Sequence, residues 1–128
     1  MSDRLLLDTN ILIDFLRRHS HAIAFVDSLA TRPAISVITV SELFAGVREG
    51  RERDELERFF SRSVVLDVDE QIAMRAGVLL RLYRKSHGVG LADALIAATA
   101  EAESARLATL NVKHFPMLPD ALVPYTKA

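Results

Sequence analysis

Two patterns of apolar positions alternate along this chain, short continuous runs and segments with helical spacing. Apolar runs too short for free-standing helices occur at 5–7, 34–37, 64–68 and 106–110. Between these runs, apolar residues recur every three or four positions, which is the spacing of one helix face. Strands separated by helical segments predict a parallel sheet covered by helices. We therefore expect an α/β fold, a three-layer α/β/α domain with a central parallel sheet of about four to five strands.

The ends of the helical segments are marked by capping residues, glycines and prolines. Periodicity predicts helices over about 10–18, 20–31, 39–50, 51–62, 70–86 and 91–104. Ser20 is expected to cap the second helix, and Thr39 and Glu42 have the spacing of a capping box at the start of the third. The segment 123–126 is expected to form a short edge strand, a position that tolerates Pro124.

Length and composition limit the class of protein. The chain has 128 residues, half of them apolar, which fits a single domain over residues 1–128. No stretch approaches the roughly 18 uncharged residues of a membrane span, and the first residues are unlike a secretion signal, so we expect a cytoplasmic protein. The absence of cysteine excludes disulfides, a thiolate nucleophile and cysteine-bound zinc. Any chemistry must therefore come from oxygen and imidazole groups.

Four oxygen-bearing side chains stand where a strand is expected to give way to a helix or loop. They are Asp8, Glu42, Asp93 and Asn111. The carboxyl ends of parallel strands share one edge of a sheet, and ligands of such folds bind there. We therefore expect these side chains to converge, although they are far apart in sequence.

Clustered carboxylates predict a bound cation. Two carboxylates about 5 Å apart repel by roughly 3 kcal/mol at an effective dielectric of about 20, so three are tolerated only with protonation or a cation. Mg²⁺ and Mn²⁺ prefer oxygen ligands and commonly bind through a few carboxylates plus the phosphate oxygens of a substrate. A metal-activated water at such a site suits the hydrolysis of phosphodiester bonds.

Each of these residues also has a structural interpretation. Asp8 suits a helix cap, Glu42 a capping box, and Asp93 a first helical turn favoured by the helix dipole. Asn111 suits a turn. Because helix caps gather at the same edge of a parallel sheet, position alone leaves the structural and the catalytic interpretations equally open.

Four sequence blocks carry a family resemblance. They are Leu6–Asp14, Ile35–Leu43, Leu91–Ala100 and Ala108–Phe115. In this order they resemble the signature blocks of the PIN domain, and more narrowly of its VapC-type members, the ribonuclease toxins of bacterial toxin–antitoxin pairs. The resemblance implies a Mg²⁺- or Mn²⁺-dependent endoribonuclease that cleaves RNA, forms a homodimer and is held inactive by a cognate, VapB-like antitoxin.

The resemblance also assigns roles to individual residues. The residues that match the metal-binding acids of the family are Asp8, Glu42 and Asp93. Supporting polar residues are Thr9, Asn10 and Thr109. Asn111 stands where many members carry an aspartate, and its neutral amide adds no charge for a second ion. The number of metal ions, one or two, therefore stays open.

Basic residues near these blocks are candidate contacts for an RNA substrate. Sixteen basic and seventeen acidic residues leave a formal net charge of −1, which neither requires nor excludes a nucleic-acid partner because phosphate binding depends on local patches. The candidate contacts are Arg17, Arg18, Lys113 and His114. The remaining histidines are not placed as the histidine pair of a metal-free ribonuclease would require, and they are His19, His21 and His87.

Two other interpretations are weighed against catalysis. In a catalytically silent binding module, the acidic pocket would receive an arginine from a basic partner protein, because carboxylates attract a guanidinium as readily as a metal. In a phosphoryl-transfer domain, Asp8 would accept a phosphoryl group. Asn10 argues against this role, because an acid is expected two positions after such an aspartate.

Overall fold

The computed structural model describes residues 4–127 and contains, within them, one four-stranded sheet. Its strands are β1 (Leu5–Leu7), β2 (Ala34–Ser36), β3 (Val64–Leu66) and β4 (Arg106–Ala108). The order is β3-β2-β1-β4, and every neighbouring pair is parallel. β1 therefore lies inside the sheet. β2 and β3 are added on one side of β1 and β4 on the other, and we call the boundary between β1 and β4 the switch point.

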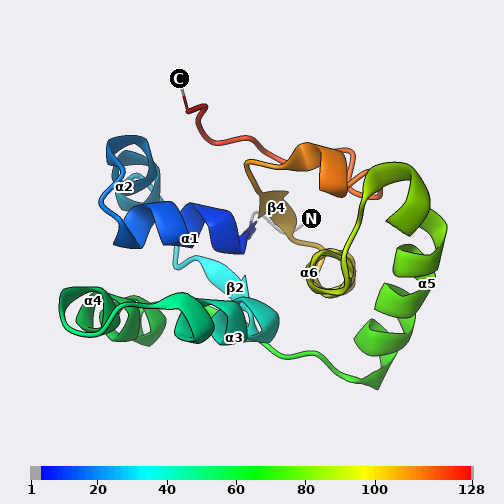
Figure 1. The fold of residues 1–128 in the computed structure, drawn as a ribbon, viewed down its shortest axis with the longest axis horizontal. Helices are drawn as coiled ribbons and strands as arrows, with labels where there is room; N and C mark the ends of the chain where they lie inside the picture. Colours follow the sequence, from blue (N-terminus) through cyan, green and yellow to red (C-terminus); the bar gives the residue numbers. More distant parts are fainter. Residues whose placement is uncertain (1–3, 128) are drawn as a thin grey trace.

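Helices cover both faces of this sheet (Figure 1). On one face lie α1 (Thr9–Leu16), α2 (Ser20–Asp27), α3 (Val37–Gly46) and α4 (Arg51–Ser61). On the other lie α5 (Glu70–His87) and α6 (Leu91–Ala102), and a short 3-10 helix, η1 (Val112–His114), follows β4. The predicted three-layer α/β/α architecture is confirmed. Between residues 4 and 127, no helix combines the length and the apolar character needed to cross a membrane.

The alternation of side chains along the strands builds a separate core on each face. Leu6 packs with residues of α5 and α6, whereas Leu7 packs with residues of α1, α3 and α4. Ala34 and Ile35 repeat this alternation on β2, and all four side chains are fully buried. Strands with apolar side chains on both faces are what a parallel sheet between two helix layers requires.

Small side chains let α6 lie close to the sheet. The residues Ala94, Ala97, Ala98 and Ala100 are each no more than 1% exposed. Close packing of this kind leaves little freedom for a helix to shift. It therefore fixes the position of the first turn of α6, which carries Asp93.

The predicted start of the third helix is wrong. α3 begins at Val37 and is capped by Ser36, whose hydroxyl accepts a hydrogen bond from the Ile38 amide at 3.0 Å. Thr39 and Glu42 therefore lie inside the helix and do not form a capping box. The reason is local: the Ser36 hydroxyl satisfies an amide of the first turn two residues after itself.

Two smaller predictions also fail. Within the described chain, the segment 123–126 is not a strand: Leu122 makes an isolated parallel bridge to Ala108, and the chain then leaves the sheet. Pro124 lacks the amide hydrogen that a strand ladder uses. Ser20 is the first residue of α2, and His19 occupies its cap position without a side-chain bond to the backbone.

Two helices end at left-handed residues that are not glycine. After α1, Arg18 has a φ of 61° and donates its amide to the Phe15 carbonyl at 3.1 Å. After α6, Ser104 has a φ of 51° and donates its amide to the Glu101 carbonyl at 3.2 Å. This geometry is the Schellman termination, in which glycine is the usual residue because a Cβ crowds the left-handed conformation.

Replacing Ser104 with glycine should raise the free energy of unfolding by about 1 kcal/mol, because it relieves left-handed strain. Arg18→Gly relieves the same strain but removes an exposed ion pair to Glu55, which contributes about 0–1 kcal/mol, so its gain should be smaller. Urea unfolding of both variants measures the two effects. A loss of stability in Ser104→Gly would contradict the assignment of strain.

Candidate active site

Asp8 stands at the carboxyl end of β1 and bonds to two neighbours at once. It is the N-cap of α1, and its Oδ1 accepts a hydrogen bond from the Thr9 amide at 2.8 Å. Its Oδ2 accepts from the Thr109 hydroxyl at 2.7 Å. This second bond joins the ends of β1 and β4 at the point where the strand order reverses, which is where open parallel sheets bind ligands.

The Thr9 hydroxyl connects α1 to Glu42 of α3. It lies 2.6 Å from Glu42 Oε1 and 3.0 Å from Thr39 Oγ1. A hydroxyl has one hydrogen and a carboxylate only accepts, so Thr9 donates to Glu42 and accepts from Thr39. Thr39 is fully buried and Glu42 is exposed. A buried threonine pair thus orients a carboxylate that solvent can reach.

Asp93 joins the site through a second set of contacts. Its Oδ2 accepts from the amide of the α6 cap residue at 3.3 Å and lies 3.5 Å from His114 Nδ1. The same His114 nitrogen lies 2.8 Å from Asn111 Nδ2. The backbone amide of Asn111 donates a hydrogen bond to Thr109 Oγ1 at 3.0 Å. Polar contacts therefore connect Asp93 to the threonine that bonds to Asp8.

The three acids are coupled electrostatically. The pKa of Asp8 is raised from its ordinary 3.8 to about 6, mainly by burial and in smaller part by the negative charges of Asp93 and Glu42. Hydrogen bonds from Thr109 and from the Thr9 amide act in the opposite direction without cancelling the effect of burial. The site thus carries negative charge that a cation would offset.

The donor set fits a hydrated, hard cation. Carboxylate and amide oxygens are the ligands that Mg²⁺ and Mn²⁺ prefer, and the raised pKa of Asp8 marks a carboxylate that a cation would help to ionise. Across residues 4–127, no three His, Asp or Glu side chains already stand together as a metal-binding group. Since Mg²⁺ usually keeps several waters and binds through one or two carboxylates, a closed cage is not required.

The other predicted residues lie at different distances from these acids. Asn10 lies in α1, and its Oδ1 is buried without a hydrogen-bond partner among the described residues. Arg17 and Arg18 follow the last turn of α1, so one helix length, about 12 Å, separates them from Asp8. Lys113 is exposed in η1.

Three histidines take part in other contacts. The rings of His19 and His21 are 5.5 Å apart and lie 5.7 and 6.2 Å from the ring of Tyr125. His87 Nδ1 lies 2.7 Å from the Ser86 hydroxyl. These contacts join His19 and His21 to the C-terminal segment, and His87 is the last residue of α5.

Three residues of the site have contacts that the sequence analysis did not predict. Thr39 and Glu42 are three positions apart, a spacing that places them on one face of a helix, so a helical interpretation of this block would have paired them. The sequence predicts His114 as an RNA contact, and the structure places its Nδ1 beside Asn111 and Asp93. No local signal links His114 to Asp93, because the contact forms only when η1 packs against the start of α6.

The fold and the site together define a class of protein. It is a parallel α/β domain with helices on both faces and with coupled acids at its switch point. The chain matches the PIN domain family over residues 5–116, and it belongs to that family. The family predicted from the sequence blocks is thereby confirmed.

Similar proteins bear names from the VapC group. The chain is 46% identical to Ribonuclease VapC19 of Mycobacterium tuberculosis over 124 residues, which are 94% of this chain and 98% of the relative. It is 42% identical to Ribonuclease VapC10 of the same organism over 127 residues, 94% and 92% of the two chains. Its fold matches a toxin–antitoxin complex from Klebsiella pneumoniae with a TM-score of 0.81 and 30% identity, covering 96% of this chain and 99% of that one.

The raised pKa of Asp8 has a consequence for stability without divalent ions. Because the folded-state pKa lies above the unfolded value, stability should fall as the pH rises from about 4 to about 6, where folded Asp8 loses its proton. Asp8→Asn should therefore raise the free energy of unfolding by about 2 to 3 kcal/mol at pH 7.5 and by little near pH 4.

Urea unfolding in EDTA at both pH values tests this prediction. Asp120→Asn, at an exposed aspartate, is the matched control. Its change in the free energy of unfolding relative to the wild type should be the same at both pH values. An equal gain for Asp8→Asn at pH 4 and pH 7.5 would show that charge burial is not its cause.

Proposed function

We propose that this protein is an endoribonuclease that hydrolyses RNA phosphodiester bonds with the help of Mg²⁺ or Mn²⁺, and that it is the toxin of a toxin–antitoxin pair. One observation carries the proposal: the coupling of Asp8, Glu42 and Asp93 at the switch point of a PIN domain sheet. Relatives named as ribonucleases, which align over nearly the whole chain, support RNA as the substrate.

In this proposal Asp8 holds the cation together with Glu42 or Asp93. When bound, the ion supplies charge that stabilises the phosphorus oxygens and activates a water molecule for in-line attack. Thr109 and the Thr9 amide keep the two oxygens of Asp8 in fixed directions. A carboxylate already held in place loses little freedom on binding a ligand, so these bonds prepare the site before substrate arrives.

Two other groups have assisting roles in the proposal. The Thr9 hydroxyl donates a hydrogen bond to Oε1 of Glu42. The other oxygen, Oε2, is then the one that accepts a hydrogen bond or a proton from the attacking water. Asn111, held by His114, offers a neutral amide at the edge of the site. Because an amide brings no charge, this arrangement favours one metal ion over two.

An antitoxin and a second copy of the chain are the proposed partners. The similar fold from Klebsiella pneumoniae is that of a toxin–antitoxin complex, which supports a VapB-like antitoxin for this protein. An acidic pocket binds a guanidinium as well as a metal, so an arginine of the antitoxin that enters it would block the reaction. The family resemblance is the support for the proposed homodimer.

Asp8→Asn and Asp93→Asn should each reduce Mn²⁺-dependent cleavage of single-stranded RNA at least about a hundredfold, because each removes a charge that holds the cation. Gel analysis of end-labelled RNA measures the loss, and circular dichroism checks that the variants are folded. Asp120→Asn serves as the control and should cleave normally. Cleavage at the normal rate in both site variants would disprove the assignment.

A metal titration separates the enzyme from a catalytically silent binding module. We expect the wild type to bind Mn²⁺ in calorimetry and Asp8→Asn to bind it at least about tenfold more weakly. The silent module would instead show no Mn²⁺ binding and tight binding of an arginine-rich peptide. That pair of results would replace the proposed enzyme with a partner-binding protein.

A further inference from the structure

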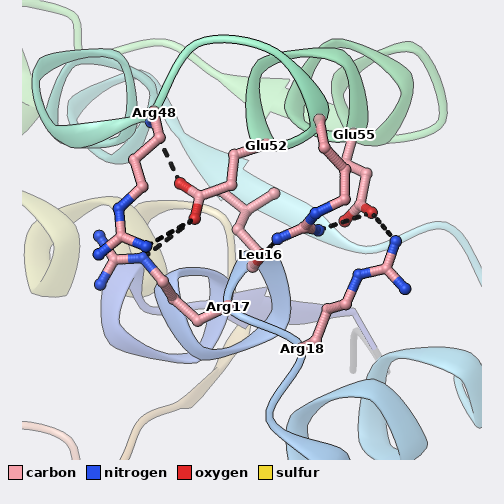
Figure 2. Close-up of polar contacts among 7 residues, drawn as sticks. Leu16, Arg17, Arg18, Arg48, Glu52 and Glu55 are labelled. Carbon is pink, nitrogen blue, oxygen red and sulfur yellow. Dashed lines mark hydrogen bonds and ion pairs between the residues drawn. The ribbon is translucent and has the colours of Figure 1, made fainter.

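Arginines gather where the end of α1 meets the start of α4 (Figure 2). We call this group the arginine cluster, and it consists of Arg17, Arg18, Arg48 and Arg51 with the carboxylates of Glu52 and Glu55. Figure 2 shows Glu52 pointing toward Arg17 and Arg48, and Glu55 pointing toward Arg18. Glu52 is only 4% exposed, so it forms a buried anchor beneath exposed guanidinium groups.

The carboxylates of the cluster are shared. Arg17 Nε and Arg48 Nη1 lie 3.2 and 3.8 Å from the same oxygen, Glu52 Oε2. In the same way, Arg18 Nη2 and Arg51 Nη1 lie 3.0 and 2.9 Å from Glu55 Oε1. Among the described residues of the cluster, four guanidinium groups therefore face two carboxylates, and each guanidinium keeps donors for a further acceptor.

Two arginines outside the cluster are neutralised more completely. Arg53 of α4 pairs with two glutamates, Glu49 at 3.2 Å and Glu57 at 2.9 Å. Arg75 of α5 makes two bonds to Glu101, at 2.8 and 3.3 Å. Each guanidinium group of the arginine cluster thus shares its carboxylate with a second one, whereas Arg53 and Arg75 do not.

The arginine cluster is continuous with the proposed active site. Arg17 and Glu52 line a cavity of about 60 Å³ whose wall also includes Glu42. One length of α1, about 12 Å, separates Arg17 from Asp8. A chain of phosphates with one member at the carboxylates would therefore have others within reach of the arginines.

Arg18 is held in a conformation that favours glycine. Its φ of 61° costs backbone energy that a glycine would avoid. The ion pair to Glu55 is exposed and does not require Arg18, because Arg51 already bonds to the same oxygen. Glu55 therefore keeps a partner without Arg18, and the exposed guanidinium group of Arg18 is available to a ligand.

We propose that the arginine cluster binds the phosphate backbone of single-stranded RNA beside the bond to be cleaved. This inference rests on the proposed function and adds the surface that positions the substrate. Arginine suits the role because its planar group bonds to phosphate oxygens in pairs and stays charged. Contacts of this kind set the position of a strand without selecting its sequence.

Fluorescence anisotropy with a labelled oligouridylate of about twelve nucleotides, in EDTA, measures binding without cleavage. The informative variants are Arg18→Gly and Arg48→Gln, because neither leaves a buried carboxylate without a partner. We expect the double variant to bind RNA about five- to tenfold more weakly. The slope of the logarithm of the binding constant against the logarithm of the salt concentration should become shallower by about 0.7 for each lost contact. Thermal unfolding of each variant confirms that it is folded.

Two matched controls accompany these variants. Ser104→Gly makes the same backbone change as Arg18→Gly at the end of another helix, and it should leave RNA affinity unchanged. Arg75→Gln removes one positive charge from the opposite face of the sheet and should also have no effect beyond about twofold. The two controls show whether a loss of RNA affinity comes from the arginine cluster itself or only from a change in stability or in total charge.

The outcomes separate this inference from the proposed function. Unchanged RNA affinity in the double variant, or no binding by the wild type, would overturn the inference even if Mn²⁺-dependent cleavage is observed. Binding that depends on the arginines, without any cleavage, would support the inference and refute the enzyme. Polyglutamate binding that is lost in the double variant, with RNA binding unchanged, would assign the surface to an acidic protein partner and overturn the proposal.

Discussion

The structure depends on one buried ionisable group, the carboxylate of Asp8. It closes the first turn of α1 and bonds to Thr109 after β4, so it joins the inner strand, its helix and the neighbouring strand. With 7% of its surface exposed, the ionised form is poorly solvated, and its pKa of about 6 expresses this cost. A fold that keeps such a group ionised gains from a positive charge beside it, which is the physical basis for a cation at this edge.

The structural and chemical interpretations of the acids are not alternatives. Asp8 caps α1 with Oδ1 and accepts from Thr109 with Oδ2, while Asp93 accepts from the start of α6 and still raises the pKa of Asp8. Helix N-termini carry partial positive charge, which reduces the cost of bringing acids together before any ligand binds. The geometry that makes each acid a good cap is therefore the geometry that assembles the site.

The parallel α/β architecture could be predicted because its signals are local: apolar runs at the strands and helical periods between them. Most helix starts could be predicted as well, but the start of α3 could not, since Val37 has the side chain of a strand residue yet begins α3 once Ser36 caps it. The positions of the acids followed from strand ends, but the bonds that orient them did not. The spacing of Thr39 and Glu42 indicates that they share a helix face, but it does not indicate Thr9 as their partner, because that contact forms only through the packing of α1 against α3.

Both ends of α1 carry charges that the helix dipole favours, a carboxylate at the N-terminus and arginines at the C-terminus. These are also the signs that suit a cation at one end and a phosphate chain at the other. Glu52 and Glu55 of α4 hold Arg17 and Arg18 in place, so the distance between the two charged regions is set by the length of a rigid helix. One turn more or less in α1 would move the arginines by about 5.4 Å relative to Asp8. The register of a bound strand over the carboxylates is therefore a property of the fold itself.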